Sequence, residues 1–429
     1  MFYQQQIDAC FVGNIGESSG ITPEDFDAQL ARTDAIIASL SEAKQQGKLP
    51  ILTLPETVSD LRVIESTASH IQTQFKNLVV LGTGGSSLNG QALVGLRSCE
   101  NRVGNVPTRV HFMDNIDPYD VQCLLGSIDL QKTAFLVISK SGKTLETLTQ
   151  MMVCIDFVRK AVGNAVGKHF FVVSDPIDNP LRQVGIAIQA TLLDHEPDVG
   201  GRFSTFTNVG LLPAKVAGVD IHKARQGAAS IIADTFASKS HSAVAKGAAL
   251  NVAFIQKGMN VNVMMAYIDR LANFVTWYRQ IWAESLGKEG RGSTPVKAMG
   301  TLDQHSQLQL YLDGPRDKLF TLITMDTARD GYRISTEGLP DIGMGYVNDK
   351  TLGDVLQAEH QATISTMIRK QCPVREIRIK KLDEHVLGAL LMHFTLETIV
   401  VAGLLGINAF DQPAVEDGKI LARQLLEQA

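Results

Sequence analysis

The chain has 429 residues, of which 45% are hydrophobic and 20% are charged. This composition is typical of a folded globular protein of roughly two to three domains, and it excludes a disordered chain. Lys and Arg together number 40 and Asp and Glu 45, so the formal net charge is −5. A chain with this charge has no field that would attract nucleic acid, and we expect no nucleic-acid partner.

The number and spacing of the cysteines indicate the redox environment in which the protein works. The chain has five cysteines, an odd number, and no Cys-x-x-Cys pair. This favours a reduced intracellular protein over a disulfide framework or a cysteine-based zinc site. The N-terminus has no basic start and no long apolar core, so it does not resemble a secretory signal. We therefore expect a cytoplasmic protein.

One stretch, residues 387–410, is apolar enough to suggest a membrane span. His393 and Glu397 lie in its interior, and each would be costly in lipid. The stretch therefore predicts a fully buried helix, and we expect no membrane association.

The predicted elements change character along the chain. Residues 1–50 are polar with apolar side chains at loose helical spacing, and a second helical stretch follows at about 55–75. Short apolar runs then alternate with helical stretches. The predicted strands are 78–81, 109–113, 134–138 and 169–173, with a further candidate at 191–193, and the helices between them include 118–125 and 144–162. This alternation indicates a buried parallel sheet with helices on both faces.

A second region of the same kind begins after about residue 210. Its predicted helices are 224–236, 243–257 and 270–286, its predicted strands are 261–267 and 318–325, and the last eighty or so residues are predicted to be helical again. The expected fold class is α/β, with two doubly wound parallel-sheet domains, each of three α/β/α layers, and helical extensions at both ends. The expected boundaries are 1–50 for the N-terminal extension, 51–205 and 206–385 for the two domains, and 386–429 for the C-terminal segment.

A loop rich in Gly and Ser, residues 82–88 (GTGGSSL), follows the first predicted strand. Glycines let a backbone approach a ligand closely, and the N-terminus of a following helix attracts anions. The loop is not a dinucleotide motif, because Ser87 stands where GxGxxG requires its last glycine. Its serines suit a phosphate monoester, although a plain tight turn is the simpler interpretation.

A second hydroxyl-rich loop, residues 139–144 (SKSGKT), follows the third predicted strand. It is not a P-loop, because Val137 stands where that motif requires its first glycine. Three hydroxyls and two lysines between a strand and a helix predict an anion site, although the hydroxyls could instead cap the helix. Two such loops in one sheet favour a ligand site, because open α/β sheets bind ligands at the carboxyl ends of their strands.

Four further charged or titratable residues stand out along the chain. Arg202 follows two glycines and carries a permanent charge that suits an oxyanion, although an ion pair is the commoner fate. Glu284 ends a predicted helix where the dipole opposes its charge, which hints at a general base. His305 is a buried, hydrogen-bonded histidine or a proton-transfer group. Lys419 lies on a predicted C-terminal helix, where a solvated side chain is the simpler interpretation.

Together these segments resemble the glucose-6-phosphate isomerase (phosphoglucose isomerase) family in its shorter, bacterial-type form. The resemblance covers about residues 78–420 and rests on separated motifs in the family order: TGGSSL, SKSGKTLET, GGRFS, AESLGK, DQHSQ and FDQPAVEDGK. The departures are Ala414, where the family usually has Gly, and the Asp417-Gly418 pair. The stretch 330–349 shows little resemblance.

The resemblance implies two sugar-isomerase (SIS) domains, a homodimer, and no cofactor or metal. It makes Glu284 the base that moves a proton between C1 and C2, and Arg202 the group that stabilises the enediolate. Lys419 and a His305 contributed by the neighbouring subunit would open the sugar ring. The implied substrate contacts are Gly85, Ser86, Ser139, Lys140, Ser141, Thr144 and Gln412, with Glu146 in the same motif as Thr144.

The expected function is reversible isomerisation of D-glucose 6-phosphate to D-fructose 6-phosphate through ring opening and an enediolate, in glycolysis and gluconeogenesis. Two alternatives remain open. A bifunctional phosphoglucose/phosphomannose isomerase would also act on mannose 6-phosphate. A non-catalytic SIS-type sugar-phosphate regulator would have no reason to keep Glu284, Arg202, His305 and Lys419 together.

Overall fold

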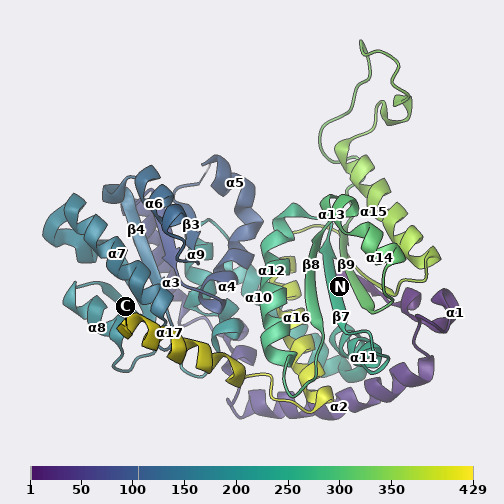
Figure 1. Ribbon diagram of the computed structural model, residues 1–429, viewed down its shortest axis with the longest axis horizontal. Coiled ribbons are helices and arrows are strands. Elements are labelled where there is room, and N and C mark those ends of the chain that lie inside the picture. Colours follow the sequence, from purple (N-terminus) through teal and green to yellow (C-terminus); the bar gives the residue numbers. More distant parts are fainter. Residues whose placement is uncertain (1, 105, 429) are drawn as a thin grey trace.

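Two five-stranded sheets with helices packed around them form the body of the structure, a computed structural model that describes residues 2–104 and 106–428 (Figure 1). The first sheet is entirely parallel, in the order β3-β2-β4-β5-β6. Its strands are β2 (Asn77–Leu81), β3 (Arg109–Met113), β4 (Thr133–Ile138), β5 (Phe170–Ser174) and β6 (Thr191–Asp194). Every residue of β4 and β5 is buried, because helices cover both faces of the sheet.

The helices of this first half begin with α3, before β2, and then alternate with its strands. They are α3 (Leu61–Gln74), α4 (Gly85–Val94), α5 (Ser98–Val103), α6 (Pro118–Ser127), α7 (Leu145–Val162), α8 (Pro180–Ala187) and α9 (Asn208–Val216). The short 3-10 helix η7 (Gly201–Phe206) precedes α9. The helix α4 begins within the first hydroxyl-rich loop and α7 directly after the second, so both loops lie at the carboxyl edge of the sheet.

The second sheet has the order β1-β10-β9-β7-β8, and only β1 runs antiparallel. Its strands are β1 (Tyr3–Gln6), β7 (Val261–Ala266), β8 (Thr294–Met299), β9 (Lys318–Met325) and β10 (Val374–Ile379). The helices around it are α1 (Val12–Ile15), α2 (Pro23–Gln45), α10 (Ile221–Ser238), α11 (Ala243–Gln256), α12 (Ala272–Leu286), α13 (Leu302–Ser306), α14 (Leu308–Asp313), α15 (Leu352–Arg369) and α16 (Glu384–Leu405). The last helix, α17 (Glu416–Gln428), is exposed along its length.

A buried polar cluster fixes β1 on the second sheet. Arg375 of β10 donates to both carboxylate oxygens of Glu397 on α16, at 2.7 and 2.6 Å, and both side chains are fully buried. Tyr3 of β1 bonds His393 at 2.5 Å, and His393 in turn bonds Glu397 at 2.9 Å. Gln5 accepts from Arg375 at 2.7 Å. A buried charge must be paired and hydrogen-bonded. Tyr3 and Gln5 supply hydrogen bonds to this buried cluster, and these bonds hold β1 against β10.

The expected α/β class with two parallel sheets is confirmed, and the predicted strands of the first sheet all form. The all-helical prediction for the N-terminus is wrong at β1, which is held by the buried cluster rather than by its own polar sequence. The return to helix over the last eighty residues is wrong at β10, where Arg375 and Glu376 interrupt the apolar run. No sequence pattern indicated β8, a half-buried edge strand containing Pro295.

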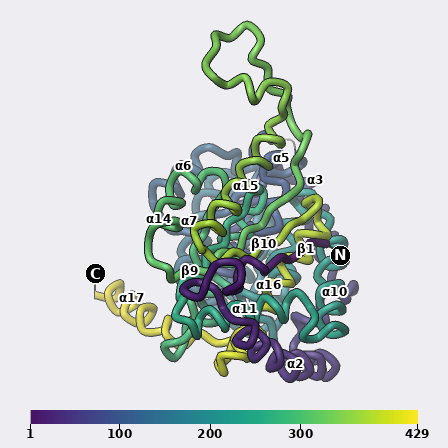
Figure 2. The backbone as a smooth tube through the Cα atoms, turned by 90° about the vertical axis from the view of Figure 1, so that its right-hand side faces the viewer, coloured from purple at the N-terminus to yellow at the C-terminus, as the bar shows by residue number. Residues whose placement is uncertain are grey.

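Two segments leave the body of the molecule. The arm, defined here as residues 326–351 between β9 and α15, projects beyond the second sheet (Figure 1). The helix α17 projects at another side, as Figure 2 shows. By contrast, α16 lies inside: it is long and apolar enough to cross a membrane, but 94% of its most apolar window is buried in the protein. This agrees with its predicted role as a core helix.

Candidate active site

Glu284 lies on the last turn of α12, the helix that packs against α4 of the first half and α16 of the second. Trp277, Tyr278 and Trp282 of α12 are almost completely buried, which fixes the helix between the two sheets. The Glu284 side chain stays 36% exposed. Its Oε1 accepts from Nε2 of Gln280 at 2.8 Å, and its Oε2 lies 3.4 Å from Nη1 of Arg202. The carboxylate is therefore oriented by two partners while remaining open to solvent.

Arg202 lies on η7 with its side chain only 3% exposed. Burial lowers the pKa of its guanidinium, whereas the charges of Glu284 and Asp411 raise it, and an arginine still keeps its proton in a protein. All three nitrogens donate to the protein. Nε donates to Ser285 Oγ at 2.8 Å. Nη1 donates to Gln412 Oε1 at 2.7 Å and lies 3.4 Å from Glu284 Oε2. Nη2 donates to the backbone carbonyls of Ala409 at 2.5 Å and Asp411 at 3.0 Å. Arg202 thus joins α12 to the segment before α17.

A buried amide, Asn89 of α4, holds the two Gly-rich segments together. Its Nδ2 donates to the carbonyls of Gly85 at 2.6 Å and Gly201 at 2.7 Å, and its Oδ1 accepts from Nε1 of Trp277 at 3.0 Å. A Cβ atom on Gly85 would lie 2.3 Å from the carbonyl oxygen of Gly201, so only glycine permits this approach. Ser86 follows at the start of α4, half-buried. The first loop is therefore packed directly against the turn that carries Arg202.

The second loop has its hydroxyls at the start of α7. Ser139, buried, and Thr144 share a hydrogen bond of 2.8 Å between Oγ and Oγ1, and Thr144 makes no capping bond to α7. Ser141 Oγ accepts from the backbone N–H of Lys143 at 3.2 Å. Glu146 lies half-buried in the first turn of the helix. The simpler interpretation, in which Thr144 is merely the helix cap, therefore does not describe this loop.

Lys140 is placed differently from the expectation of a phosphate contact. Its Nζ donates to the carbonyls of Pro197 at 2.6 Å and Val199 at 2.9 Å. These carbonyls belong to the segment that leads from β6 into Gly201 and Arg202. In this structure Lys140 ties the second loop to the Arg202 turn, and a direct contact with a phosphate stays a prediction.

The structure brings together Glu284, Arg202, Gln412 and the Gly85 loop, but not His305 or Lys419. His305 lies exposed on α13 and makes no side-chain hydrogen bond to any described residue. Lys419, 66% exposed on α17, pairs with Glu416 at 2.7 Å rather than with Glu284. These two side chains are therefore exposed to solvent, and in the described part of the chain they make no hydrogen bond or ion pair with Glu284 or Arg202.

Several residues of the site were not found from the sequence. Gln280 and Ser285 contact the two central side chains, and Lys288 pairs with Asp411 at 2.7 Å and donates to the carbonyl of Asn408. Gln280 stands one helical turn before Glu284, a spacing that would have identified it as a neighbour of the carboxylate. Asn89 gave no such signal, because its partners are far away in the sequence.

Comparison with known proteins gives the family. The family model described as phosphoglucose isomerase matches residues 61–311 and 347–429. The chain belongs to the phosphoglucose isomerase family. The glucose-6-phosphate isomerase of Carboxydothermus hydrogenoformans is 34% identical over 421 residues, covering 94% of this chain and 90% of that protein. The probable glucose-6-phosphate isomerase of Methanococcus maripaludis is 36% identical over 426 residues, covering 97% and 92%.

Solved structures agree on the fold of this phosphoglucose isomerase family member. The crystal structure of a hypothetical protein from Thermus thermophilus superposes with a TM-score of 0.87 at 30% identity, covering 99% of this chain and 100% of that one. A glucose-6-phosphate isomerase from Chlamydia trachomatis gives a TM-score of 0.71 at 24% identity, covering 86% and 72%. Most of the arm, residues 326–346, falls in the gap that the family model leaves between residues 311 and 347.

Proposed function

We propose that this protein catalyses the reversible isomerisation of glucose 6-phosphate and fructose 6-phosphate. Family membership supports the reaction, and the approach of the Glu284 carboxylate to the Arg202 guanidinium, 3.4 Å apart beside the Gly85 loop, is the observation that carries it. An aldose–ketose interchange removes a proton from the carbon next to a carbonyl and returns it to the adjacent carbon. One carboxylate performs both transfers, provided that a fixed cation stabilises the enediolate between them.

In this mechanism Glu284 takes the proton from C2 of the open-chain sugar and returns it to C1. The amide of Gln280 fixes one carboxylate oxygen and leaves the other to act as base. Arg202 stabilises the enediolate, and it must exchange one of its present acceptors for the substrate oxygen because all of its nitrogens are occupied. Gln412 is the acceptor best suited to leave, because it is neutral and belongs to an exposed segment.

The hydroxyls of Ser139, Ser141 and Thr144 would hold the phosphate at the start of α7, with Gly85 and Ser86 lining the sugar. A helix N-terminus supplies free amide donors and a favourable dipole for such a dianion. Binding energy from the phosphate then positions C1 and C2 against Glu284. Lys419 and His305 would open the sugar ring before the proton moves.

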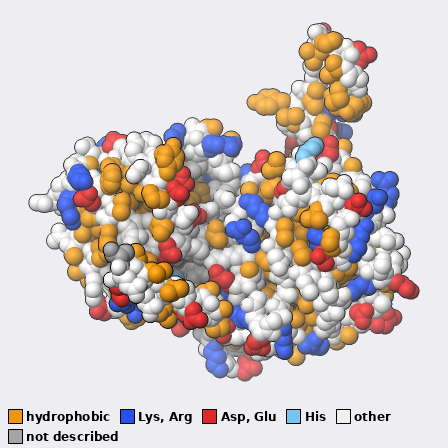
Figure 3. Space-filling view, viewed as in Figure 1, with side chains coloured by type: hydrophobic (Ala, Val, Ile, Leu, Met, Phe, Trp, Pro, Cys, Tyr) orange, Lys and Arg blue, Asp and Glu red, His pale blue; other side chains and the backbone are white. Residues whose placement is uncertain are grey.

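The expected assembly is a homodimer in which the exposed His305 of one chain would complete the site of the other, as the family resemblance implies. The arm supports contact with a second copy. Figure 3 shows hydrophobic side chains gathered over the arm. Tyr332 and Tyr346 of the arm are 86% and 72% exposed. Side chains of this kind are enriched at protein interfaces. Cytoplasmic localisation completes the proposal, in keeping with a sugar-phosphate substrate.

Three experiments test the proposed function. A coupled assay from fructose 6-phosphate, run on protein dialysed against EDTA, should give glucose 6-phosphate; absence of turnover would refute it, and dependence on an added divalent ion would refute the metal-free mechanism. The same assay with mannose 6-phosphate distinguishes the bifunctional alternative.

Mixing His305→Ala and Glu284→Gln subunits should restore activity, because some hybrid sites carry both groups. Hybrid dimers that stay inactive would contradict the shared site.

A further inference from the structure

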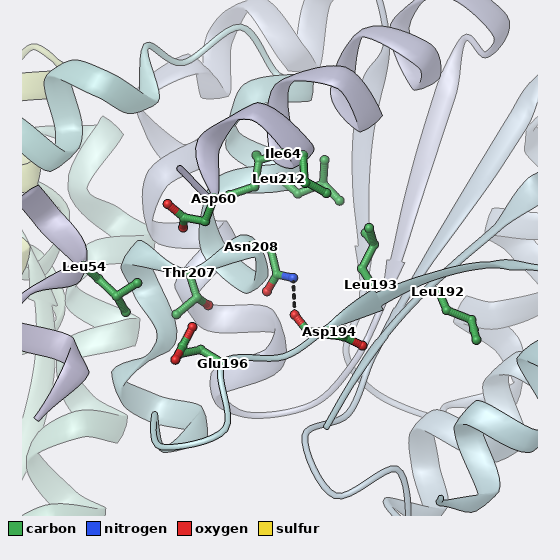
Figure 4. A pocket seen from close by; sticks show the side chains of 11 residues that line it. Leu54, Asp60, Ile64, Leu192, Leu193, Asp194, Glu196, Thr207, Asn208 and Leu212 are labelled. Carbon is green, nitrogen blue, oxygen red and sulfur yellow. Dashed lines mark hydrogen bonds between the residues drawn. The ribbon is translucent and has the colours of Figure 1, made fainter. Parts of the chain in front are cut away.

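A cavity of about 280 Å³ lies at the edge of the first sheet, between β6, α3 and the start of α9 (Figure 4). Leu54, Ile64, Leu193 and Leu212 give it apolar walls, and Val63 lies at its rim. Glu284 and Arg202 do not line it, and nor do the two hydroxyl-rich loops. The proposed mechanism therefore makes no use of this space.

The polar side chains of the cavity are acidic or accept hydrogen bonds. Asp60 is neutralised by Arg225, which donates to its two oxygens at 2.8 and 2.5 Å, and Asp194 pairs with Arg182 at 2.9 Å. Glu196 makes no ion pair with any described residue. Among the three carboxylates that line the cavity, Glu196 is thus the one without a compensating charge from the described residues.

A second polar group of the cavity also lacks a partner. Asn208 donates from Nδ2 to the carbonyl of Asp194 at 2.8 Å, the dashed line in Figure 4, but its buried Oδ1 accepts no hydrogen bond from any described residue. A buried acceptor without a donor is costly. The neighbouring hydroxyl of Thr207 is already used, since it donates to Ser204 and accepts from the backbone of Val209. The described residues that line the cavity therefore offer it no free donor and no positively charged side chain.

We propose that this cavity is a second binding site, for a small organic cation with an apolar body, such as a primary alkylamine. The ammonium would pair with Glu196 and donate to Oδ1 of Asn208, and the hydrocarbon would pack against the leucines. The uncompensated Glu196 carboxylate disfavours a sugar phosphate at this place, because like charges repel. The size of the cavity, near the lower limit for ligand pockets, restricts the ligand to a few carbon atoms beyond the amine.

The segment that forms one wall of the cavity continues into the active site. His195, buried between Asp194 and Glu196, bonds the Glu196 carbonyl through Nδ1 at 2.8 Å. Lys140 of the second loop binds the next carbonyls along, those of Pro197 and Val199, and the chain then enters Gly201 and Arg202. A cation bound at Glu196 would therefore act on a segment attached to both halves of the active site, and its effect should appear in the KM for the sugar phosphate.

The test uses cyclohexylamine, protonated at neutral pH, and cyclohexanol as its uncharged counterpart of similar size, titrated calorimetrically into the full-length protein. The amine should bind once per chain, with saturation in the millimolar range, and at least about fivefold more tightly than the alcohol. Glu196→Gln should remove that preference. Val63→Trp, at a position 55% exposed, should block the cavity, whereas Val103→Trp on α5, 65% exposed and outside the cavity, should not.

Binding of amine and alcohol with equal affinity would overturn the proposal, as would amine binding that Glu196→Gln and Val63→Trp leave unchanged. Saturating fructose 6-phosphate is the further control: amine binding that it abolishes would assign the amine to the active site and refute a separate one. The calorimetric readout needs no turnover, so its failure is distinguishable from failure of the proposed function.

Discussion

Replacing Glu284 by Gln tests the proposed proton carrier with the least structural disturbance. The amide keeps the size of the side chain but cannot accept a proton from carbon. The two hydrogen bonds at this position can adapt: Gln280 Oε1 is buried without a partner among the described residues, so a flip of the Gln280 amide would let it accept from the NH₂ group that the substitution introduces. The other end keeps an oxygen toward Arg202. We therefore expect folding stability to change by less than about 1 kcal/mol.

The catalytic effect should be far larger than the structural one. General base catalysis contributes about 10²–10⁴-fold, which corresponds to about 2.7–5.4 kcal/mol of activation free energy, so kcat should fall by that factor. KM should change little, because the proposed phosphate contacts on α7 remain. Exchange of the C2 proton of glucose 6-phosphate with deuterated solvent, followed by NMR, should disappear together with isomerisation. Interconversion of the anomers should persist, because ring opening does not use this carboxylate.

Glu289→Gln is the matched control for this prediction. Glu289 is an exposed carboxylate in the turn directly after α12, so its substitution removes the same charge without touching Arg202 or Gln280. It should leave kcat within about twofold of the wild-type value, as surface substitutions usually do. Retained C2 exchange in Glu284→Gln would refute the assignment, and Glu146 in the first turn of α7 would be the next carboxylate to test.

Three other predictions follow from the contacts. Ser139→Ala combined with Thr144→Ala should raise KM at least about tenfold, because each lost bond to a charged group is worth about 1.5–3 kcal/mol; an unchanged KM would remove this loop from the site. Gln412→Ala should free one Arg202 donor and change kcat while the unfolding midpoint stays within a few degrees. Glu397→Ala should cost about 3–5 kcal/mol in urea unfolding, because it leaves the buried Arg375 unpaired; a loss below about 1 kcal/mol would contradict this.

The buried cluster also sets a pH dependence with a defined sign. Burial alone would raise the pKa of Glu397, but the charge of Arg375 and the bonds from His393 and Arg375 outweigh it and hold the pKa at about 2. A carboxyl with a lowered folded-state pKa stabilises the fold above its unfolded value, near 4.5, and loses that stabilisation as the pH falls toward 2. Burial lowers the pKa of His393, so protonation of the unfolded chain below about pH 6.5 weakens the fold further. Stability, measured by urea unfolding across this range, should therefore decline steadily below about pH 6.5.

The sequence predicted the first sheet well because its strands are short apolar runs separated by helices, a pattern that buried parallel strands require. It failed for β1 and β10 because their polar residues are buried by partners elsewhere in the chain. Arg375, for example, looks like a surface residue until Glu397 and Gln5 are placed around it. No local pattern carries that information.

The candidate site was likewise predicted only in part from the sequence. Motifs located the residues whose chemistry is specific, and Arg202, Glu284 and Gln412 do lie in contact. What the motifs could not show is that every nitrogen of Arg202 is already bound to protein, so that this residue joins the core to the C-terminal segment before it meets any substrate. An arginine in this state is held in position by its neighbours at no further entropic cost, which is the condition under which a fixed charge stabilises an oxyanion most effectively. A structural role for Arg202 in a buried hydrogen-bond network is thus compatible with a catalytic role, because the contacts that bury Arg202 also orient it beside Glu284.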